Sequence, residues 1–234
     1  MLSDLFSSEG EEQGPQAVEV RGRTFLLRLA ESDANEARQT LFACHLWQGA
    51  VALARHMAES SIDWPSSSVV ELGAGAGLPS LVARSLGARR VVATDFPSPP
   101  VLANLARNIE ENSAQLSGSL PSVVLGHRWG EDTAPVLAAN DGRRFDVALC
   151  AECLWKHDQH GILLSSLREL VSVGGLALVS FSHHVPGLEQ RDLGFFALAE
   201  ECGFRAVHVE EVPARHMWNE SASVSMHIYR LERP

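Results

Sequence analysis

The 234-residue sequence contains little lysine, few cysteines and no long apolar run. Lys156 is the only lysine, and 29 acidic residues against 19 basic ones give a net charge of −10. This balance argues against nucleic-acid binding as the main activity, although an acidic surface can attract a basic protein. The four cysteines are too few and too scattered for a disulfide framework, which indicates a reducing compartment.

No apolar stretch approaches the roughly 20 residues that span a membrane, so we expect no membrane partner. The first 16 residues, MLSDLFSSEGEEQGPQ, are acidic where a secretory signal has basic residues and an apolar core. The sequence alone therefore predicts a cytoplasmic protein.

The chain divides into a short N-terminal part and one long domain. Residues 1–17 are polar and acidic, which predicts a flexible N-terminus. Residues 18–29 alternate around an Arg-Gly-Arg break, as in a hairpin, and residues 41–60 have the apolar spacing of a helix. We expect residues 18–234 to form a single domain, with residues 18–60 packed beside a core of 67–234.

From residue 67 onward, strand and helix patterns alternate. The predicted strands are 68–72, 88–95, 121–129, 145–152 and 174–182, and the helices between and after them are 78–87, 98–112, 131–140, 158–171 and 189–203. Two last strands, 204–212 and 223–232, leave no room for a helix between them and should pair antiparallel. This order predicts an α/β fold with a mostly parallel sheet that ends in an antiparallel hairpin.

The stretch ELGAGAGLPS (71–80) places three glycines directly after the first core strand. In a parallel sheet, such a turn puts bare backbone in the ligand crevice, at the start of a helix. Asp95 closes the next strand, 18 residues after Gly77, near the offset at which an acid binds a ribose diol. Together these features predict a nucleoside-bearing cofactor. The alternative is a tight turn with Asp95 as a helix cap.

The glycine spacing distinguishes between nucleoside cofactors. Gly73, Gly75 and Gly77 follow G-x-G-x-G, whereas dinucleotide-binding proteins use G-x-G-x-x-G. Glu71, just ahead of the glycines, suits a positively charged cofactor better than a pyrophosphate, which it would repel. S-adenosylmethionine therefore fits better than NAD.

With these residues in view, the sequence resembles the seven-strand S-adenosylmethionine methyltransferases and, within them, lysine methyltransferase family 16. The likeness covers about residues 40–205, and its motifs are LWQGAVALA (46–54), ELGAGAGLPSLVA (71–83), GARRVVATDFP (87–97), HRWG (127–130) and ECLW (152–155). The stretch FSHHVPGLEQRDLGFFALAEECGF (181–204) is similar to fungal members that methylate the N-terminus and lysines of elongation factor 1A, some of them labelled nicotinamide N-methyltransferase-like.

The resemblance implies a Rossmann-like seven-stranded sheet with helices on both faces, S-adenosylmethionine as the cofactor, and a protein substrate, with elongation factor 1A suspected. We expect a monomer. The predicted cofactor-binding residues are Trp47, Glu71, Gly73, Ala74, Gly75, Asp95, Phe96, Trp129 and Ala151. Trp47 and Trp129 offer flat apolar faces to the cofactor; the alternative is that both are ordinary core tryptophans.

The segment after the fourth core strand departs from the family pattern. The family has Asp-x-x-Tyr or Asp-x-x-Phe, whereas this sequence has Glu152-Cys153-Leu154-Trp155. We predict that Glu152 orients the acceptor amine and that Trp155 forms an aromatic wall that favours the neutral amine. The alternative is that Glu152 caps the following helix and that Trp155 packs under it.

Histidines and cysteines near this segment suggest other chemistry. Cys150, Cys153, His157 and His160 imitate a zinc spacing, but they cross from a buried strand into a helix, so we expect neither a metal site nor redox activity. His184 either borders the acceptor pocket or is a plain loop residue. Two rival functions remain open at this point, namely methylation of a small pyridine or amine, and a cofactor-binding partner protein without catalysis.

Overall fold

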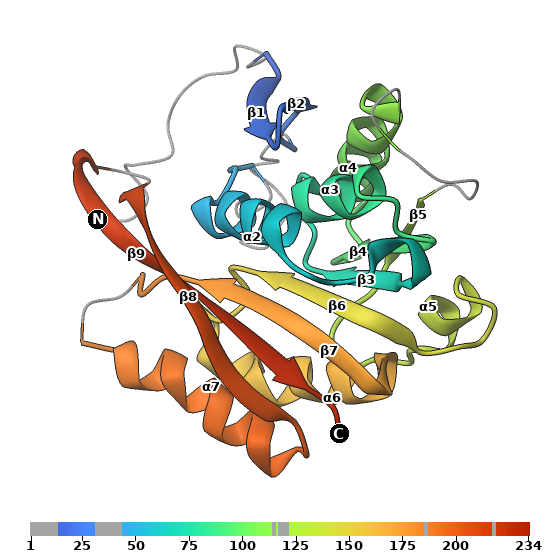
Figure 1. Ribbon diagram of the computed structural model, residues 1–234, viewed down its shortest axis with the longest axis vertical. Coiled ribbons are helices and arrows are strands. Elements are labelled where there is room, and N and C mark those ends of the chain that lie inside the picture. The colour runs from blue at the N-terminus through green and yellow to red at the C-terminus, as the bar shows by residue number, and fades with distance from the viewer. Residues whose placement is uncertain (1–13, 31–43, 114–115, 117–121, 185–186, 217–218) are drawn as a thin grey trace.

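The computed structural model describes residues 14–30, 44–113, 116, 122–184, 187–216 and 219–234. Within these ranges, one large twisted sheet carries helices on both faces (Figure 1). The sheet strands are β3 (Ser68–Leu72), β4 (Arg90–Asp95), β5 (Val123–Gly126), β6 (Phe145–Ala151), β7 (Val171–Phe181), β8 (Arg205–His216) and β9 (Asn219–Glu232). The helices are α2 (Gln48–Glu59), α3 (Leu78–Ser85), α4 (Pro99–Glu111), α5 (Ala134–Ala138), α6 (His160–Leu170) and α7 (Glu189–Glu201), with 3-10 turns η2 (Trp64–Ser66) and η4 (His157–Gln159).

The seven strands are ordered β5-β4-β3-β6-β7-β9-β8. Strands β3 to β7 are parallel, while β9 runs antiparallel to both β7 and β8. The α/β fold with its C-terminal antiparallel hairpin is thus confirmed. The chain builds outward from β3 to β5 and then returns to β6, so the strand order reverses between β3 and β6. This is where parallel sheets bind ligands.

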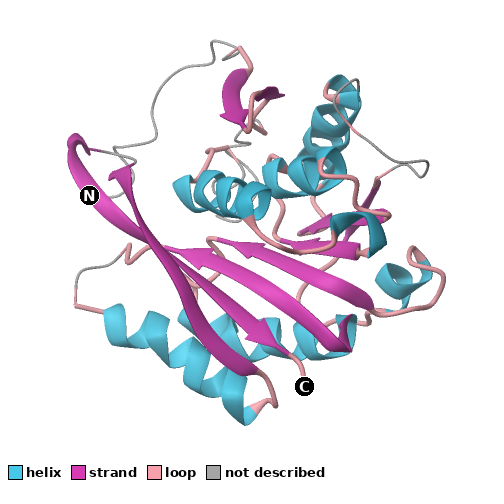
Figure 2. Cartoon of the chain, in the orientation of Figure 1, coloured by secondary structure: helices cyan, strands magenta, loops and turns pink. Residues whose placement is uncertain are grey.

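Helices cover both faces of the sheet (Figure 2), and the strand side chains alternate between two apolar layers. Val69 and Val91 pack with α2 and α3 on one face, whereas Val70 and Val92 pack with α6 on the other. All five residues of β3 are buried, as expected for a central strand covered on both sides. Among the described helices, none has the length and apolar character needed to cross a membrane.

The predicted N-terminal hairpin is present as a separate two-stranded ribbon, β1 (Gln16–Val20) and β2 (Arg23–Leu27). Arg21 and Gly22 both have positive φ, which is the type I′ geometry that suits a tight hairpin. Pairing begins at Gln16, so two residues of the segment expected to be flexible belong to a strand, because Gln16 pairs with Leu27. Residues 1–13 lie outside the described residues.

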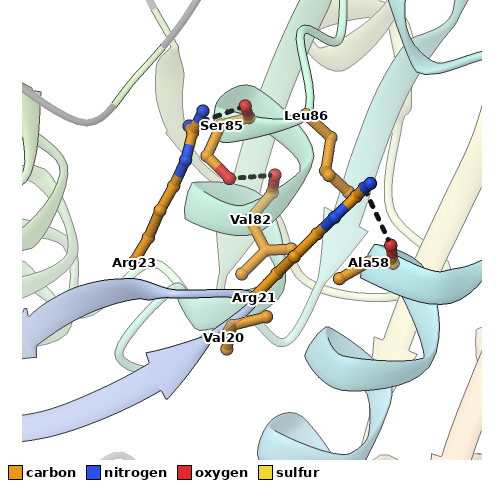
Figure 3. Close-up of a pocket in the computed structure, with 7 residues that line it drawn as sticks. All are labelled: Val20, Arg21, Arg23, Ala58, Val82, Ser85 and Leu86. Atoms are coloured by element: carbon orange, nitrogen blue, oxygen red, sulfur yellow. Dashed lines mark hydrogen bonds between the residues drawn. The ribbon is translucent and has the colours of Figure 1, made fainter.

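The ribbon is held on the sheet's helices by two arginines that bond helix C-terminal carbonyls (Figure 3). Arg21 Nη1 donates to the carbonyl of Ala58, and Arg23 Nη1 donates to that of Ser85, at 3.1 and 2.8 Å. A cavity of about 290 Å³ lies between these arginines, Val82 and Leu86. Both guanidinium groups bond carbonyls at helix ends, so the cavity is part of the contact between the ribbon and helices α2 and α3.

Several element boundaries differ from the sequence prediction. The helix expected from residue 41 begins at Gln48, because Trp47 has extended backbone angles; residues 41–43 lie outside the described residues. The strand expected over 121–129 ends at Gly126, so Trp129 lies in the turn that follows. The placement of Pro79 in the first turn of α3 is confirmed. The last two strands are longer than expected, since their mutual pairing extends to His216 and Asn219.

Candidate active site

The glycine turn, residues 73–77, joins β3 to α3 at the carboxyl end of the sheet. Its backbone is tied to β4, since the Ala74 N–H donates to the Thr94 carbonyl at 2.9 Å. Gly73 has φ +73°, and a Cβ added there would lie 3.2 Å from Cys153 Sγ and 3.3 Å from Trp129 Cζ2. A side chain would therefore crowd the space between the turn and Trp129, whereas glycine leaves the backbone accessible to a ligand.

Asp95 lies beside this turn, at the end of β4. One carboxyl oxygen accepts the Gly75 N–H and the other accepts the Phe96 N–H, each at 2.6 Å. Each oxygen retains a second lone-pair position for a hydroxyl donor. Burial raises the pKa of Asp95, although both N–H groups act in the opposite direction. Asp95 is thus bonded to the glycine turn, and its contact with a ribose stays a prediction.

In the structure Glu71 bonds the start of α3, a contact that the sequence interpretation did not include. Its Oε2 accepts the Ser80 N–H at 2.9 Å and the Ser80 hydroxyl at 2.5 Å, so it caps the N-terminus of α3. The side chain is buried, and burial raises its pKa to about 8, which favours the neutral acid at pH 7. Glu71 therefore fixes the start of α3, and its direct contact with a cofactor stays a prediction.

Two aromatic residues flank the turn. The Arg128 guanidinium lies 4.4 Å over the centre of the Phe96 ring, an attractive cation–π arrangement. Trp129 is half-buried and packs against the apolar layer that contains Leu72 and Cys153. Phe96, Trp129, Gly73 and Asp95 thus lie around one turn, which brings the residues predicted to bind adenine and ribose together.

Glu152 occupies a strained and buried position directly after β6. Its φ is +55°, a conformation that costs a non-glycine residue about 1–2 kcal/mol. Its Oε1 accepts the Gly49 N–H at 3.2 Å, and its Oε2 lies 3.3 Å from the Ser182 N–H and 2.8 Å from His184 Nε2. The carboxylate thus bonds the first turn of α2 and the segment after β7. A cap on the helix that follows Glu152, one of the two sequence interpretations, is not what the structure has.

His184 completes this cluster. Burial acts to lower its pKa, but the hydrogen bond and the charge of Glu152 outweigh burial and raise the pKa above 6.5. The Trp47 and His184 rings meet edge to face, with centres 5.2 Å apart. Trp47, at the N-terminal end of α2, therefore lies in the same cluster of side chains as Glu152 and His184.

Trp155 lies three residues further on, and its surroundings differ from those of Glu152. Trp155 is 37% exposed, whereas Leu154 before it is buried. Ala151, the last residue of β6, is half-buried. Both interpretations of Trp155, the aromatic wall at the acceptor and the contact under the following helix, stay predictions.

Sequence reasoning missed the residues that hold Glu152 in place. Gly49 fits because a Cβ there would lie 2.6 Å from Glu152 Cγ. The buried Ser180 donates its hydroxyl to the Gly49 carbonyl at 2.8 Å, and its own carbonyl accepts the Glu152 N–H at 2.7 Å. A glycine in the first turn of a helix was the only available signal, and it did not indicate its partner.

The residues with zinc-like spacing bond to separate partners. His157 Nε2 lies 2.7 Å from Asp192, which His183 also contacts at 2.7 Å. His160 Nε2 bonds the Leu154 carbonyl at 2.8 Å. A hydrogen bond with Cys150 and burial raise the pKa of the Cys153 thiol, which keeps it protonated.

The geometry of the turn fits an adenosyl sulfonium cofactor. Asp95 has acceptor positions for a ribose diol, Gly73 leaves the backbone open, and Trp129 and Phe96 provide apolar faces. The fold is similar to that of the Thermus thermophilus 16S rRNA N2 G1207 methyltransferase RsmC, solved with AdoMet and guanosine, with a TM-score of 0.59 and 14% identity. That match covers 94% of this chain and 50% of RsmC. Fold and site together define an S-adenosylmethionine-dependent methyltransferase.

Sequence comparison gives the family. The chain belongs to the lysine methyltransferase family, which it matches over residues 29–202. The protein N-terminal and lysine N-methyltransferase EFM7 of Gibberella zeae is 33% identical over 202 residues, covering 81% of this chain and 74% of that protein. The EFM7 protein of Candida glabrata is 34% identical over 189 residues, covering 79% and 73%. The family resemblance predicted from the motifs is confirmed.

Proposed function

We propose that this chain transfers methyl groups to amines of a protein, either an N-terminal α-amine, a lysine or both, and that elongation factor 1A is its substrate. The names of the relatives support the class of acceptor. The observation that carries the proposal is the step from buried Glu152 to exposed Trp155 in the segment that follows β6, since it offers an aromatic surface to a large substrate. We further propose a cytoplasmic monomer with one methyltransferase domain over residues 18–234.

The proposed cofactor contacts follow from the site. They are Trp47, Glu71, Gly73, Ala74, Gly75, Asp95, Phe96, Trp129 and Ala151. S-adenosylmethionine supplies an electrophilic methyl group on a sulfonium. Asp95 accepts hydrogen bonds from the ribose hydroxyls, while the Trp129 and Phe96 rings exclude water from the adenine. Glu71 holds the end of α3 that closes the turn.

The acceptor amine must be neutral when it attacks, although a lysine ordinarily carries a proton at pH 7 because its pKa is about 10.4. The Trp155 wall disfavours the ammonium, and Glu152 orients the amine through a hydrogen bond. His184 Nε2, 2.8 Å from Glu152 Oε2, holds this carboxylate in position, and the proton that leaves the amine passes to solvent. Trp155 would also retain a partly methylated product by cation–π attraction.

The test is methyl transfer from labelled S-adenosylmethionine by the purified chain to purified elongation factor 1A, with the methylated residue located by mass spectrometry. We expect label on the N-terminus or on a lysine. Trp155→Ala should reduce transfer at least tenfold while leaving calorimetric binding of S-adenosylhomocysteine unchanged. Glu210→Gln, on α2's side of the sheet, serves as the active control.

Three outcomes would contradict the proposal. Label on nicotinamide or another small amine, with none on protein, would favour the small-molecule function. Label on a different protein in a cell lysate would refute elongation factor 1A alone. Normal cofactor binding with no transfer to any acceptor would favour a partner protein without catalysis.

A further inference from the structure

The C-terminal hairpin brings two histidines and a glutamate together. His208 and Glu211 lie on β8, and His227 lies on β9. The metal-ligating atoms of all three lie within 4.8 Å of one another. Among the described residues, this is the one group of three such side chains that converge at this distance.

A β-bulge in β8 explains the convergence. Residues three apart on a regular strand point to opposite faces, so His208 and Glu211 would not meet. The register shifts between His208 and Glu210, however, and Glu211 becomes the direct partner of His227. The His208 and His227 rings then lie 5.8 Å apart. Glu210 instead bonds His56 of α2, at 2.6 Å.

The chemistry of the cluster is that of a zinc-type ligand set. Two imidazoles and one carboxylate leave a fourth tetrahedral position for water, and ligands about 2.0–2.2 Å from the ion are roughly 3.4 Å from one another. Glu211 Oε2 and His227 Nδ1 are already 3.9 Å apart, so small side-chain rotations complete the geometry. That distance is too long for a good hydrogen bond, so the pair alone does not explain the arrangement.

Access also suits a cation. His208 and Glu211 are exposed, so a hydrated ion reaches them from solvent. Beneath them, the His183 ring centre lies 5.1 Å from that of His227, and His183 Nδ1 is fixed by Asp192 at 2.7 Å.

We propose that His208, Glu211 and His227 form a binding site for a divalent transition-metal ion of the zinc class, which joins β8 to β9. The ion stabilises the hairpin because it binds the folded pairing and not the separated strands. The proposal does not depend on the identity of the substrate, since the three ligands include none of the residues proposed to bind the cofactor or the acceptor.

The test is calorimetric titration of the full chain with zinc chloride, with no affinity tag present, together with cobalt(II) absorption and thermal unfolding. We expect one zinc ion per chain, a tetrahedral cobalt spectrum and a zinc-dependent rise in Tm. His208→Ala and Glu211→Gln should each weaken binding at least tenfold. Glu210→Gln is the matched control. It removes the neighbouring carboxylate, which bonds His56 of α2 on the other face of the sheet, and it should bind zinc normally.

Both test variants replace exposed side chains, so their Tm in EDTA should equal that of the unaltered chain, which shows that they fold. Zinc binding that persists unchanged in His208→Ala and Glu211→Gln would place the ion elsewhere, for example on Cys44 or Cys202, and would overturn the proposal. Absence of binding at 100-fold excess zinc would do the same.

Discussion

Replacing Glu152 with Gln should destabilise the fold, and the loss should depend on pH. The Glu152 side chain is 4% exposed, and its carboxylate faces donors from Gly49, Ser182 and His184. An amide keeps one acceptor oxygen and turns an NH2 group toward at least one of these donors. Hydrogen bonds to a charged group contribute about 1.5–3 kcal/mol each, so the free energy of unfolding should fall by about 2–4 kcal/mol.

The pH dependence comes from His184. Burial alone would lower its pKa, but Glu152 raises it above 6.5. A raised histidine pKa adds stability that is fully present below pH 6.5 and is lost as the pH rises through the folded-state pKa. Without the carboxylate, only burial remains and the pKa of His184 should fall below 6.5. The destabilisation by Glu152→Gln should therefore be larger at pH 5.5 than at pH 9.

The assay is urea unfolding at both pH values, with the His184 ring titrated by NMR. In a His184→Ala background, the Glu152→Gln change should lose its pH dependence while keeping the part due to the two backbone N–H groups. Equal destabilisation at pH 5.5 and pH 9, with no downward shift of the His184 pKa, would show that the ion pair is not formed in solution.

Four further substitutions test the turn. Asp95→Asn cannot accept both backbone N–H groups that the carboxylate now accepts, so calorimetry should show S-adenosylhomocysteine binding weakened at least tenfold; unchanged affinity would remove Asp95 from the ribose site. Gly73→Ala should mainly weaken cofactor binding. Gly77→Ala should mainly lower Tm, because its Cβ would lie 2.5 Å from a Leu105 methyl group. If each variant changed cofactor affinity and Tm to the same degree, the assigned roles would be contradicted. Because the pKa of Glu71 in the folded state is raised to about 8, the native state holds an extra proton between about pH 4.5 and 8. The free energy of unfolding should therefore decrease as the pH rises through this window, by at most about 1.4 kcal/mol per pH unit. Glu71→Gln should abolish that slope in urea titrations.

The sequence predicted the features that depend on short-range patterns. Apolar runs, turn glycines and proline are local, and they were enough for the alternation of strands and helices and for the antiparallel end of the sheet. The position of Asp95 at the same edge of the sheet as the glycine turn was also predictable, since two neighbouring parallel strands bring their carboxyl ends together, whereas the bond from Gly75 to Asp95 was not predicted.

The surroundings of Glu152 could not be predicted in this way. Gly49 is 103 residues from Glu152 in the chain, and His184 is 32 residues from it, so no spacing rule connects them. The bonds of Glu71 to Ser80 were not predicted for a related reason, because an acid next to glycines does not indicate whether it faces a ligand or a helix end. The bulge in β8 is likewise invisible in the sequence, since it arises from how two long strands share one register.

The contact between β2 and α4 has a consequence for the exposed edge of the β1–β2 ribbon. Asn112 bonds both backbone groups of Leu26, and Asn108 does the same for Arg28, so two amide side chains on a helix imitate a third strand. The exposed edge of a small ribbon is thereby closed to other molecules, a protection against aggregation. Asn108 also donates to the carbonyl of Ala76, which links this edge to the cofactor loop. Deleting the ribbon would remove the Leu26 and Arg28 partners of these two buried amides and should loosen the glycine turn that Asn108 contacts.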